Sequence, residues 1–246
     1  MRSVIKSIPL LTLLFASPVV LASGNTTIES FSKAKRLMQQ SVYVGKEYQQ
    51  TLYCSAPFNM NKEVTLPEGF KATKYLNRLK KFEAEHIVPA ENYGRTFVEW
   101  REGHPSCVDS KGKSFKGRKC ASKVSREYRL MQSDMYALAP SVGAVNALRQ
   151  NYNFTMLPEA KSDFGSCDMR IENRKAQPPV AARGKIARVY LYMESAYDRY
   201  SMSSSQRQLM EAWDRQYPVT AKECEIGQRI EAVQKSKNNV LELRCN

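Results

Sequence analysis

Several common signatures are missing from this 246-residue sequence. It has only two histidines, His86 and His104, and neither a C-x-x-C nor an H-x-x-x-H spacing, so a zinc site is disfavoured. Beyond residue 22, no apolar run approaches the roughly 20 residues that a membrane span needs. No internal repeat is found. A chain of this length without these features is expected to form one domain.

Acidic residues are also in the minority. The sequence has 24 Asp and Glu against 38 Lys and Arg, which gives a net charge of +14. Such an excess attracts polyanions or acidic membrane surfaces. High net charge is also typical of disordered chains, but 42% hydrophobic and 10% aromatic residues predict a packed domain instead.

Residues 1–22 have the pattern of a secretory signal peptide. Arg2 and Lys6 provide the charged start, a short apolar core follows, and small residues up to Ala22 suit signal peptidase. We therefore expect cleavage after Ala22, a single domain over residues 23–246, and a periplasmic or secreted protein. Because Arg2 and Lys6 are the only charged residues removed, the remainder would carry +12 of the +14 charges.

All six cysteines lie beyond the signal, and an even number in an exported protein predicts three disulfides. Six cysteines allow about 15 pairings, so the sequence does not fix them. Proximity in the chain favours Cys107–Cys120 and Cys224–Cys245, which leaves Cys54–Cys167.

Hydrophobic periodicity predicts an α+β fold, with a small β region around residues 50–90 and a mainly helical C-terminal part. Residues 29–41 show helical spacing, and residues 82–88 alternate as a half-buried strand does. Thr220 and Glu223 form a capping box. The other expected elements are a strand at 50–54, a turn at 92–95, a loop over 103–121, helix-start signals at Ser133-Asp134, and helices over 142–150, 186–197 and 205–216.

The pair Glu85-His86 lies near the end of the strand expected over 82–88. A neutral imidazole can take a proton from water near neutral pH. Adjacent side chains of a regular strand point to opposite faces, so Glu85 could hold a cation while His86 faces a water molecule. A half-buried histidine without a catalytic task is the alternative, and the dipeptide alone favours it.

The expected loop over 103–121 holds a dense group of cations: Lys111, Lys113, Lys116, Arg118 and Lys119. Such a density can neutralise several phosphates with release of counterions. The guanidinium of Arg118 can bind one phosphate through two parallel hydrogen bonds. A solvated loop is the alternative, and the net charge of the whole chain favours phosphate binding.

Several runs occur together, and in the same order, as in one known family. They are TLYC at 51–54, EHIVPAENYGR at 85–95, GRKC at 117–120, SDMYALAPSVGAVNALRQN at 133–151, ARGKIARVYLYM at 182–193 and YPVTAKECEIGQRI at 217–230. The sequence thereby resembles the bacterial endonuclease I family, which are periplasmic or secreted nucleases of the ββα-metal, or His-Me finger, class. The resemblance covers essentially all of residues 23–246, and it implies a ββα-metal site within a mainly helical domain.

The resemblance also implies a role for individual residues. His86 would be the general base, Glu85 and Asn146 would bind one divalent cation, and Arg118 would contact phosphate. Two protein oxygens and several waters suit Mg²⁺, with Ca²⁺ or Mn²⁺ as alternatives. The expected substrates are DNA and RNA, bound mainly through phosphate and sugar and so with little sequence preference. Lys111, Lys113, Lys116 and Lys119 would add phosphate contacts, and a monomer is expected.

The sequence departs from the family pattern next to these residues. Tyr136 stands where the family has a histidine, and Ala144 and Leu148 replace acidic residues on either side of Asn146. A catalytically weakened or inactive nucleic-acid-binding protein of the same fold is therefore the alternative function. A cationic membrane-surface protein ranks last, because no basic helix with a broad apolar face is found.

Overall fold

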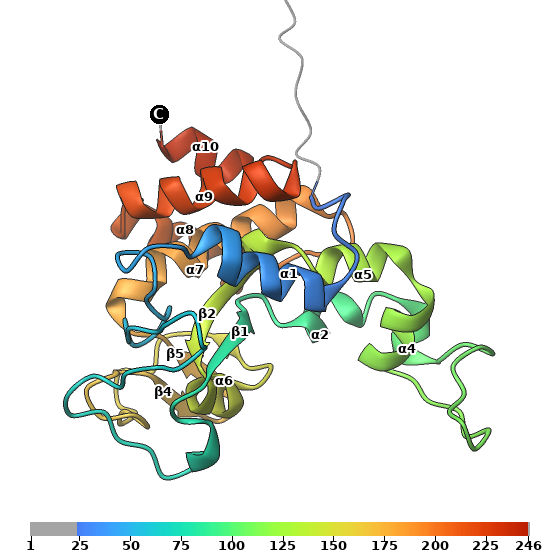
Figure 1. The fold of residues 1–246 in the computed structure, drawn as a ribbon, viewed down its shortest axis with the longest axis horizontal. Coiled ribbons are helices and arrows are strands. Elements are labelled where there is room, and N and C mark those ends of the chain that lie inside the picture. The colour runs from blue at the N-terminus through green and yellow to red at the C-terminus, as the bar shows by residue number, and fades with distance from the viewer. Residues whose placement is uncertain (1–23, 246) are drawn as a thin grey trace, which may run out of the picture.

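The computed structural model describes residues 24–245, and the expected signal peptide over 1–22 lies outside them. Helices surround a short central pair of strands, and one long loop projects from the body (Figure 1). The class is α+β, as expected from the sequence. Within the described residues, no helix has the length and apolar character of a membrane span.

The central element is a strand pair followed directly by a helix. Strand β1 (Phe82–His86) runs antiparallel to β2 (Leu138–Val142), with His86 opposite Leu138, and helix α6 (Gly143–Arg149) packs against both strands. Gly143 permits the start of α6 to approach β1 closely, because a Cβ atom there would lie 2.7 Å from Oε1 of Glu83. The strand expected over 82–88 and the helix expected over 142–150 are both confirmed.

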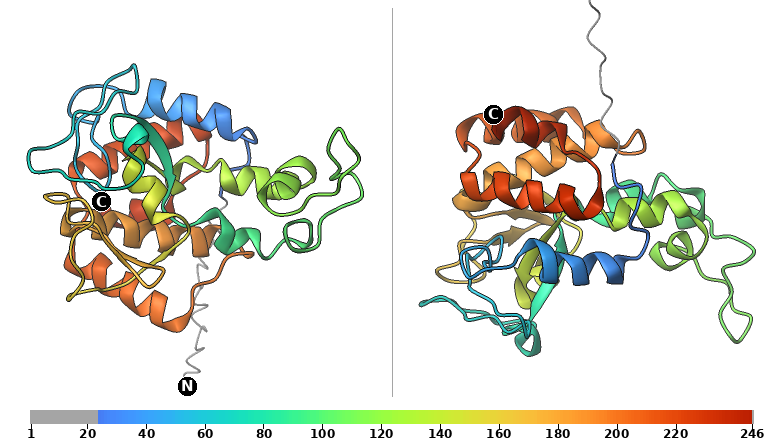
Figure 2. Two further views of the ribbon diagram at one scale, coloured as in Figure 1. Left: turned by 90° about the horizontal axis from the view of Figure 1, so that it is seen from below. Right: turned by 45° about the horizontal axis from the view of Figure 1, so that its top comes forward.

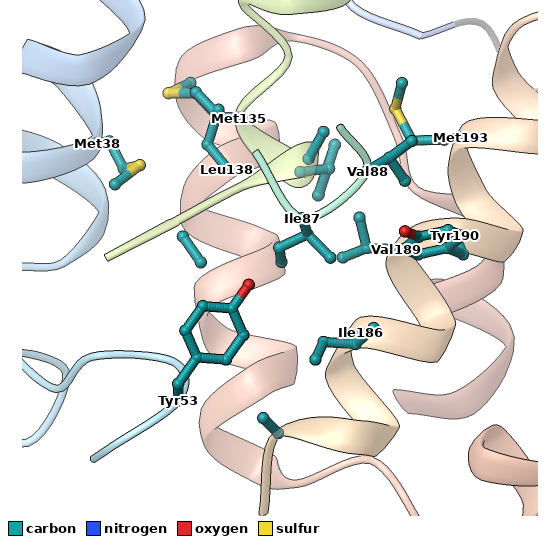
Figure 3. Close-up of a cluster of buried hydrophobic side chains, with 14 of the residues drawn as sticks. Met38, Tyr53, Ile87, Val88, Met135, Leu138, Ile186, Val189, Tyr190 and Met193 are labelled. Atoms are coloured by element: carbon teal, nitrogen blue, oxygen red, sulfur yellow. The ribbon is translucent and has the colours of Figure 1, made fainter. Parts of the chain in front are cut away.

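The C-terminal third consists of helices α7 (Val180–Ala196), α8 (Ser204–Gln216), α9 (Ala221–Gln234) and α10 (Asn239–Cys245). The helix expected over 186–197 is confirmed as part of α7, and its buried Ile186 and Val189 lie beside Ile87, which directly follows β1 (Figure 3). Thr220 accepts a hydrogen bond from the backbone N–H of Glu223, as the capping box predicts. These helices form one side of the hydrophobic core, next to β1 and β2.

Helix α1 (Phe31–Leu37) continues into one turn of π-helix (Met38–Val42) and lies across the strand pair (Figure 1). Ser30 caps its first turn by accepting from the N–H of Lys33. Four short helices form a separate lobe around the buried Tyr128. They are α2 (Ala90–Gly94), α3 (Val98–Arg101), α4 (Arg118–Val124) and α5 (Arg126–Gln132).

The loop that links α3 to α4 projects from this lobe in all views (Figures 1 and 2). We name residues 103–119, which comprise this loop and the start of α4, the basic arm. Its base is tied by the disulfide between Cys107 and Cys120. The other disulfides join Cys54 to Cys167 and Cys224 to Cys245, so all three pairings are those that the sequence favoured.

Three local expectations were wrong. Residues 51–54 form a turn rather than a strand, because the N–H of Ser55 bonds to the carbonyl of Thr51 and closes it. Residues 92–94 belong to helix α2 rather than to a turn. Residues 118–121 belong to helix α4 rather than to the loop expected over 103–121. The helix-start signal at Ser133-Asp134 is confirmed, because Asp134 caps a helix, but that helix is a single 3-10 turn (Met135–Ala137), after which the chain enters β2.

Some elements were not expected at all. These are β2, the 3-10 turn Leu76–Arg78, the helices α2–α5 and α10, and a second sheet in the order β3-β5-β4, formed by β3 (Asn153–Phe154), β4 (Arg170–Glu172) and β5 (Lys175–Gln177).

Candidate active site

His86 occupies the last position of β1 and is 8% exposed. Its Nε2 atom lies 2.8 Å from the backbone carbonyl oxygen of Gln132. A carbonyl oxygen only accepts hydrogen bonds, so Nε2 carries the proton and Nδ1 carries the lone pair. Nδ1 is therefore the atom of His86 that can accept a proton.

Two cations lie close to Phe31, the aromatic residue that packs against the His86 ring. The ring of Phe31 on α1 packs against it with a centroid separation of 4.8 Å. The Arg118 guanidinium lies 5.2 Å from the Phe31 centroid, and the Lys35 ammonium lies 4.8 Å from it. Burial, followed by the charges of Arg118, Arg149 and Lys35, lowers the pKa of His86 to about 3, although the hydrogen bond to Gln132 opposes this shift. His86 is consequently neutral throughout the physiological pH range.

Gln132, at the end of α5, connects His86 to Arg118. Its backbone carbonyl accepts from His86, and its side-chain oxygen accepts from Nε of Arg118 at 3.4 Å. Ser122 on α4 donates to the same side-chain oxygen at 3.3 Å. The sequence gives no signal for this residue, because any residue supplies a backbone carbonyl and only the fold brings it to His86.

Glu85 points to the opposite face of β1, as strand alternation predicts. It is 2% exposed, and its Oε1 accepts from the Tyr53 hydroxyl at 2.5 Å and from Arg149 at 2.8 Å. Arg149 also donates to the backbone carbonyls of His86 and Ile87, at 2.7 Å each. Burial raises the pKa of Glu85, while Arg149 and Tyr53 oppose that shift. Neither Arg149 nor Tyr53 was expected at this site from the sequence.

Asn146 bonds to a different carboxylate. Its Nδ2 donates to Oε2 of Glu83 at 2.8 Å, and Nε of Arg78 donates to Oε1 of Glu83 at 2.7 Å. Glu83 and Glu85 share one face of β1, and Asn146 and Arg149 lie one turn apart on α6. The structure therefore brings Glu85 and Asn146 to the same strand–helix interface, without a hydrogen bond between them.

The chemistry of these groups fits a hard divalent ion. Glu85 receives both of its hydrogen bonds on Oε1, and the side chain of Asn146 bonds through Nδ2. Oε2 of Glu85 and Oδ1 of Asn146 therefore accept no hydrogen bond from residues 24–245. Over the same residues, no group of three or more His, Cys, Asp or Glu side chains could hold a metal. Two protein oxygens and a shell of water are a coordination that Mg²⁺ accepts readily.

A cleft of about 420 Å³ lies along α1 and β1, lined by Phe31, Lys35, Arg36, Lys62 and Glu83, among others. Because Phe31 also contacts His86, this cationic cleft borders the histidine. The basic-arm residues Lys111, Lys113, Lys116 and Lys119 are exposed, and none of them lines this cleft. Arg118, also exposed, links the arm to His86 through Gln132.

The structure shows where the three residues that depart from the family pattern lie. The Tyr136 hydroxyl donates to the backbone carbonyl of Ser236 at 3.1 Å, so it points toward the segment after α9. Ala144 is fully buried in α6, and Leu148 is half-buried. Neither of these two can supply the negative charge that the family pattern has beside Asn146.

Known proteins similar to this chain are nucleases. Residues 31–242 match the family described as Endonuclease I. A periplasmic deoxyribonuclease from Aeromonas hydrophila is 33% identical over 96% of this chain and 93% of its own length. An extracellular deoxyribonuclease from the same species is also 33% identical, over 96% and 98%. Endonuclease-1 from Buchnera aphidicola is 30% identical over 89% and 83%. The chain therefore belongs to the endonuclease I family.

Proposed function

We propose that this protein is an exported, divalent-metal-dependent endonuclease that hydrolyses the phosphodiester bonds of DNA and RNA without sequence specificity. Membership of the endonuclease I family makes it a nuclease. The names of its relatives, periplasmic and extracellular deoxyribonuclease, support export, as does the signal pattern over residues 1–22. We propose that residues 23–246 form one nuclease domain that acts as a monomer.

The single observation that carries the mechanism is the fixed, neutral His86. Its Nε2–H donates to Gln132, so the Nδ1 lone pair is free to take a proton from the attacking water. A pKa of about 3 leaves this nitrogen unprotonated at neutral pH. The negative charge of a bound phosphate would raise that pKa and so make His86 a stronger base when substrate is present.

Arg118 would act on the phosphate itself. It is exposed, and its side chain is oriented by Gln132 and by the ring of Phe31. A guanidinium in this position can donate two hydrogen bonds to non-bridging oxygens and stabilise the charge that develops on them. Lys35, whose ammonium lies 4.8 Å from the Phe31 centroid, would add positive charge nearby.

Glu85 and Asn146 are the residues that would hold the divalent cation, with Mg²⁺ favoured and Ca²⁺ or Mn²⁺ as alternatives. When bound, such an ion supplies Lewis-acid stabilisation of the phosphoryl oxygens and of the leaving oxygen. Arg149 would orient the Glu85 carboxylate by holding Oε1. The lysines of the basic arm and of the cleft would bind phosphates along the strand, a mode of binding that would accept both DNA and RNA.

Cleavage of supercoiled plasmid and of RNA by the purified, oxidised protein tests this proposal. With Mg²⁺, the wild type should cut both substrates, and EDTA should abolish cutting. His86→Ala should reduce the rate by about 10²–10⁴-fold, the usual contribution of a general base. His104→Ala is the matched control, because it removes the other histidine, which is exposed and is neither the general base nor one of the proposed phosphate-binding residues, and it should leave the rate unchanged.

Undiminished cutting by His86→Ala would refute the general-base role. Binding of DNA without cutting in any metal would instead favour the second candidate, an inactive nucleic-acid-binding protein of the same fold. Two observations favour that candidate: Glu83 and Glu85 each pair with an arginine, and Ala144 and Leu148 lack the expected acidic groups.

A further inference from the structure

A second cationic pocket lies away from His86, where α7, the start of α9 and residues 43–52 meet. Its volume is about 180 Å³, on the order of six times the ~30 Å³ that one water occupies in the liquid. It shares no lining residue with the cleft beside β1. Two of its lining residues are lysines, Lys185 on α7 and Lys222 on α9, and we name it the two-lysine pocket.

Both ammonium groups have only neutral hydrogen-bond partners within residues 24–245. Nζ of Lys185 donates to the Tyr43 hydroxyl at 3.0 Å, and Nζ of Lys222 donates to Oε1 of Gln50 at 2.9 Å. Each side chain is half-buried. Burial and the charge of Lys185 lower the pKa of Lys222, while the charge of Glu47 opposes this shift.

The nearby carboxylate has other partners. Glu223 lines the pocket, but both of its oxygens accept from Arg188, at 2.7 and 2.6 Å. That pair is almost buried, and although the charge of Glu223 raises the pKa of Lys185, its oxygens are already held by the Arg188 guanidinium. Within residues 24–245, neither ammonium group in this half-enclosed site therefore has a carboxylate as hydrogen-bond partner.

The backbone adds to this positive potential. Thr220 lines the pocket and caps α9, a helix of 14 residues, so the positive end of the helix dipole lies at the pocket. Ammonium groups together with a helix N-terminus favour an anion with several acceptor oxygens.

We propose that the two-lysine pocket binds a phosphate group, either inorganic phosphate or the terminal phosphate of a short oligonucleotide. Lys185 and Lys222 would each donate to its oxygens, and the volume holds one phosphate group with a few waters. This site does no chemistry on the substrate and does not depend on His86. It would give a nuclease a separate contact with a phosphorylated strand end or with phosphate in the medium.

Calorimetric titration of the oxidised protein in EDTA, at constant chloride concentration, tests this site. Inorganic phosphate should bind the wild type saturably, and the double variant Lys185→Met with Lys222→Met should bind at least about tenfold more weakly, because each lysine supplies a charge-assisted hydrogen bond. Lys161→Met is the matched control, since it removes an exposed lysine outside the pocket. The thermal midpoint of each variant verifies that it is folded.

A second arm separates the two sources of phosphate. His86→Ala protein is titrated with a trinucleotide that has a 5′-phosphate and with the same trinucleotide without it. If the protein prefers the phosphorylated trinucleotide and the double lysine variant loses this preference, the ligand is a strand end. If the protein binds inorganic phosphate but shows no such preference, the ligand is the free ion. Absence of saturable binding of either ligand to folded protein overturns the proposal, as does equal affinity in the double lysine variant. Neither result bears on cleavage, because these experiments contain no metal.

Discussion

At the scale of single residues, the environment of His86 combines two effects that act in the same direction. Burial disfavours the imidazolium ion, and the nearby charges of Arg118, Arg149 and Lys35 disfavour it further. The hydrogen bond to Gln132 fixes which nitrogen is basic. A phosphate that approaches Arg118 and Lys35 would offset their charge, so the basicity of His86 is coupled to substrate binding.

The depressed pKa predicts how stability depends on pH in metal-free protein. His86 has a pKa of about 3 in the folded state and an ordinary value of 6.5, so between these values the unfolded chain binds more protons than the folded one. Stability should therefore fall as pH falls from 6.5 toward 3, with His86 contributing up to about 1.4 kcal/mol per pH unit. Urea unfolding of wild type and His86→Gln in EDTA measures this contribution.

The wild type should lose stability more steeply than His86→Gln below pH 6.5, and the two curves should run parallel above it. His104→Gln, at an exposed position, should follow the wild type at every pH. Equal slopes for the wild type and His86→Gln over pH 4–6 would contradict the buried, neutral state of His86.

Strand alternation was sufficient to predict that Glu85 and His86 point apart, because this follows from backbone geometry alone. Their partners were not predictable. Tyr53, Gln132 and Arg149 lie 32, 46 and 64 positions away from the residues they contact. Contacts over such separations depend on how elements pack, and no local pattern encodes them.

At the scale of elements, Asp134 joins several segments of the core. It caps the 3-10 turn before β2 by accepting from the N–H of Tyr136. It also accepts from Tyr192 and Tyr197 at the end of α7, and from Gln234 at the end of α9. One buried carboxylate thus fixes β2 relative to two of the C-terminal helices.

Asp134→Ala should consequently destabilise the protein by at least about 3 kcal/mol, because it leaves several buried donors without an acceptor. The free energy of unfolding from urea titration measures the loss. Asp198→Ala, at an exposed position just beyond α7, should change that free energy by less than about 0.5 kcal/mol. A loss at Asp134 as small as that at Asp198 would show that the buried network does not support the fold.

The elements found from sequence are those with a clear period. The apolar residues of helices α6, α7, α8 and α9 and of strand β1 recur regularly along the sequence, even though α7 is buried on most sides and β1 buries Glu85 as well as His86. Strand β2 buries all five residues and contains Pro140, so it shows no alternation and carries a residue that disfavours strands. Strands β3, β4 and β5 have two or three residues each, too short for any period to appear.

At the scale of the whole molecule, the positive charge is arranged over separate surfaces. The basic arm extends from the α2–α5 lobe (Figure 2), whereas the cleft beside β1 holds Lys35, Arg36 and Lys62. Arg118 lies where the arm joins the lobe, and it connects through Gln132 to His86. Composition predicted attraction to polyanions, but only the fold relates these surfaces to one another.

The salt dependence of DNA binding tests whether the arm itself binds the duplex. In His86→Ala protein with EDTA, replacement of Lys111, Lys113, Lys116 and Lys119 by Gln should reduce the slope of log Kobs against log salt by roughly 0.9 for each phosphate that the arm no longer neutralises. The control replaces four exposed lysines elsewhere, Lys46, Lys161, Lys175 and Lys235, and so makes the same change in net charge. If the arm binds phosphates, only the arm variant shows the smaller slope. An equal reduction in both variants would mean that net charge, and not the arm, attracts the nucleic acid.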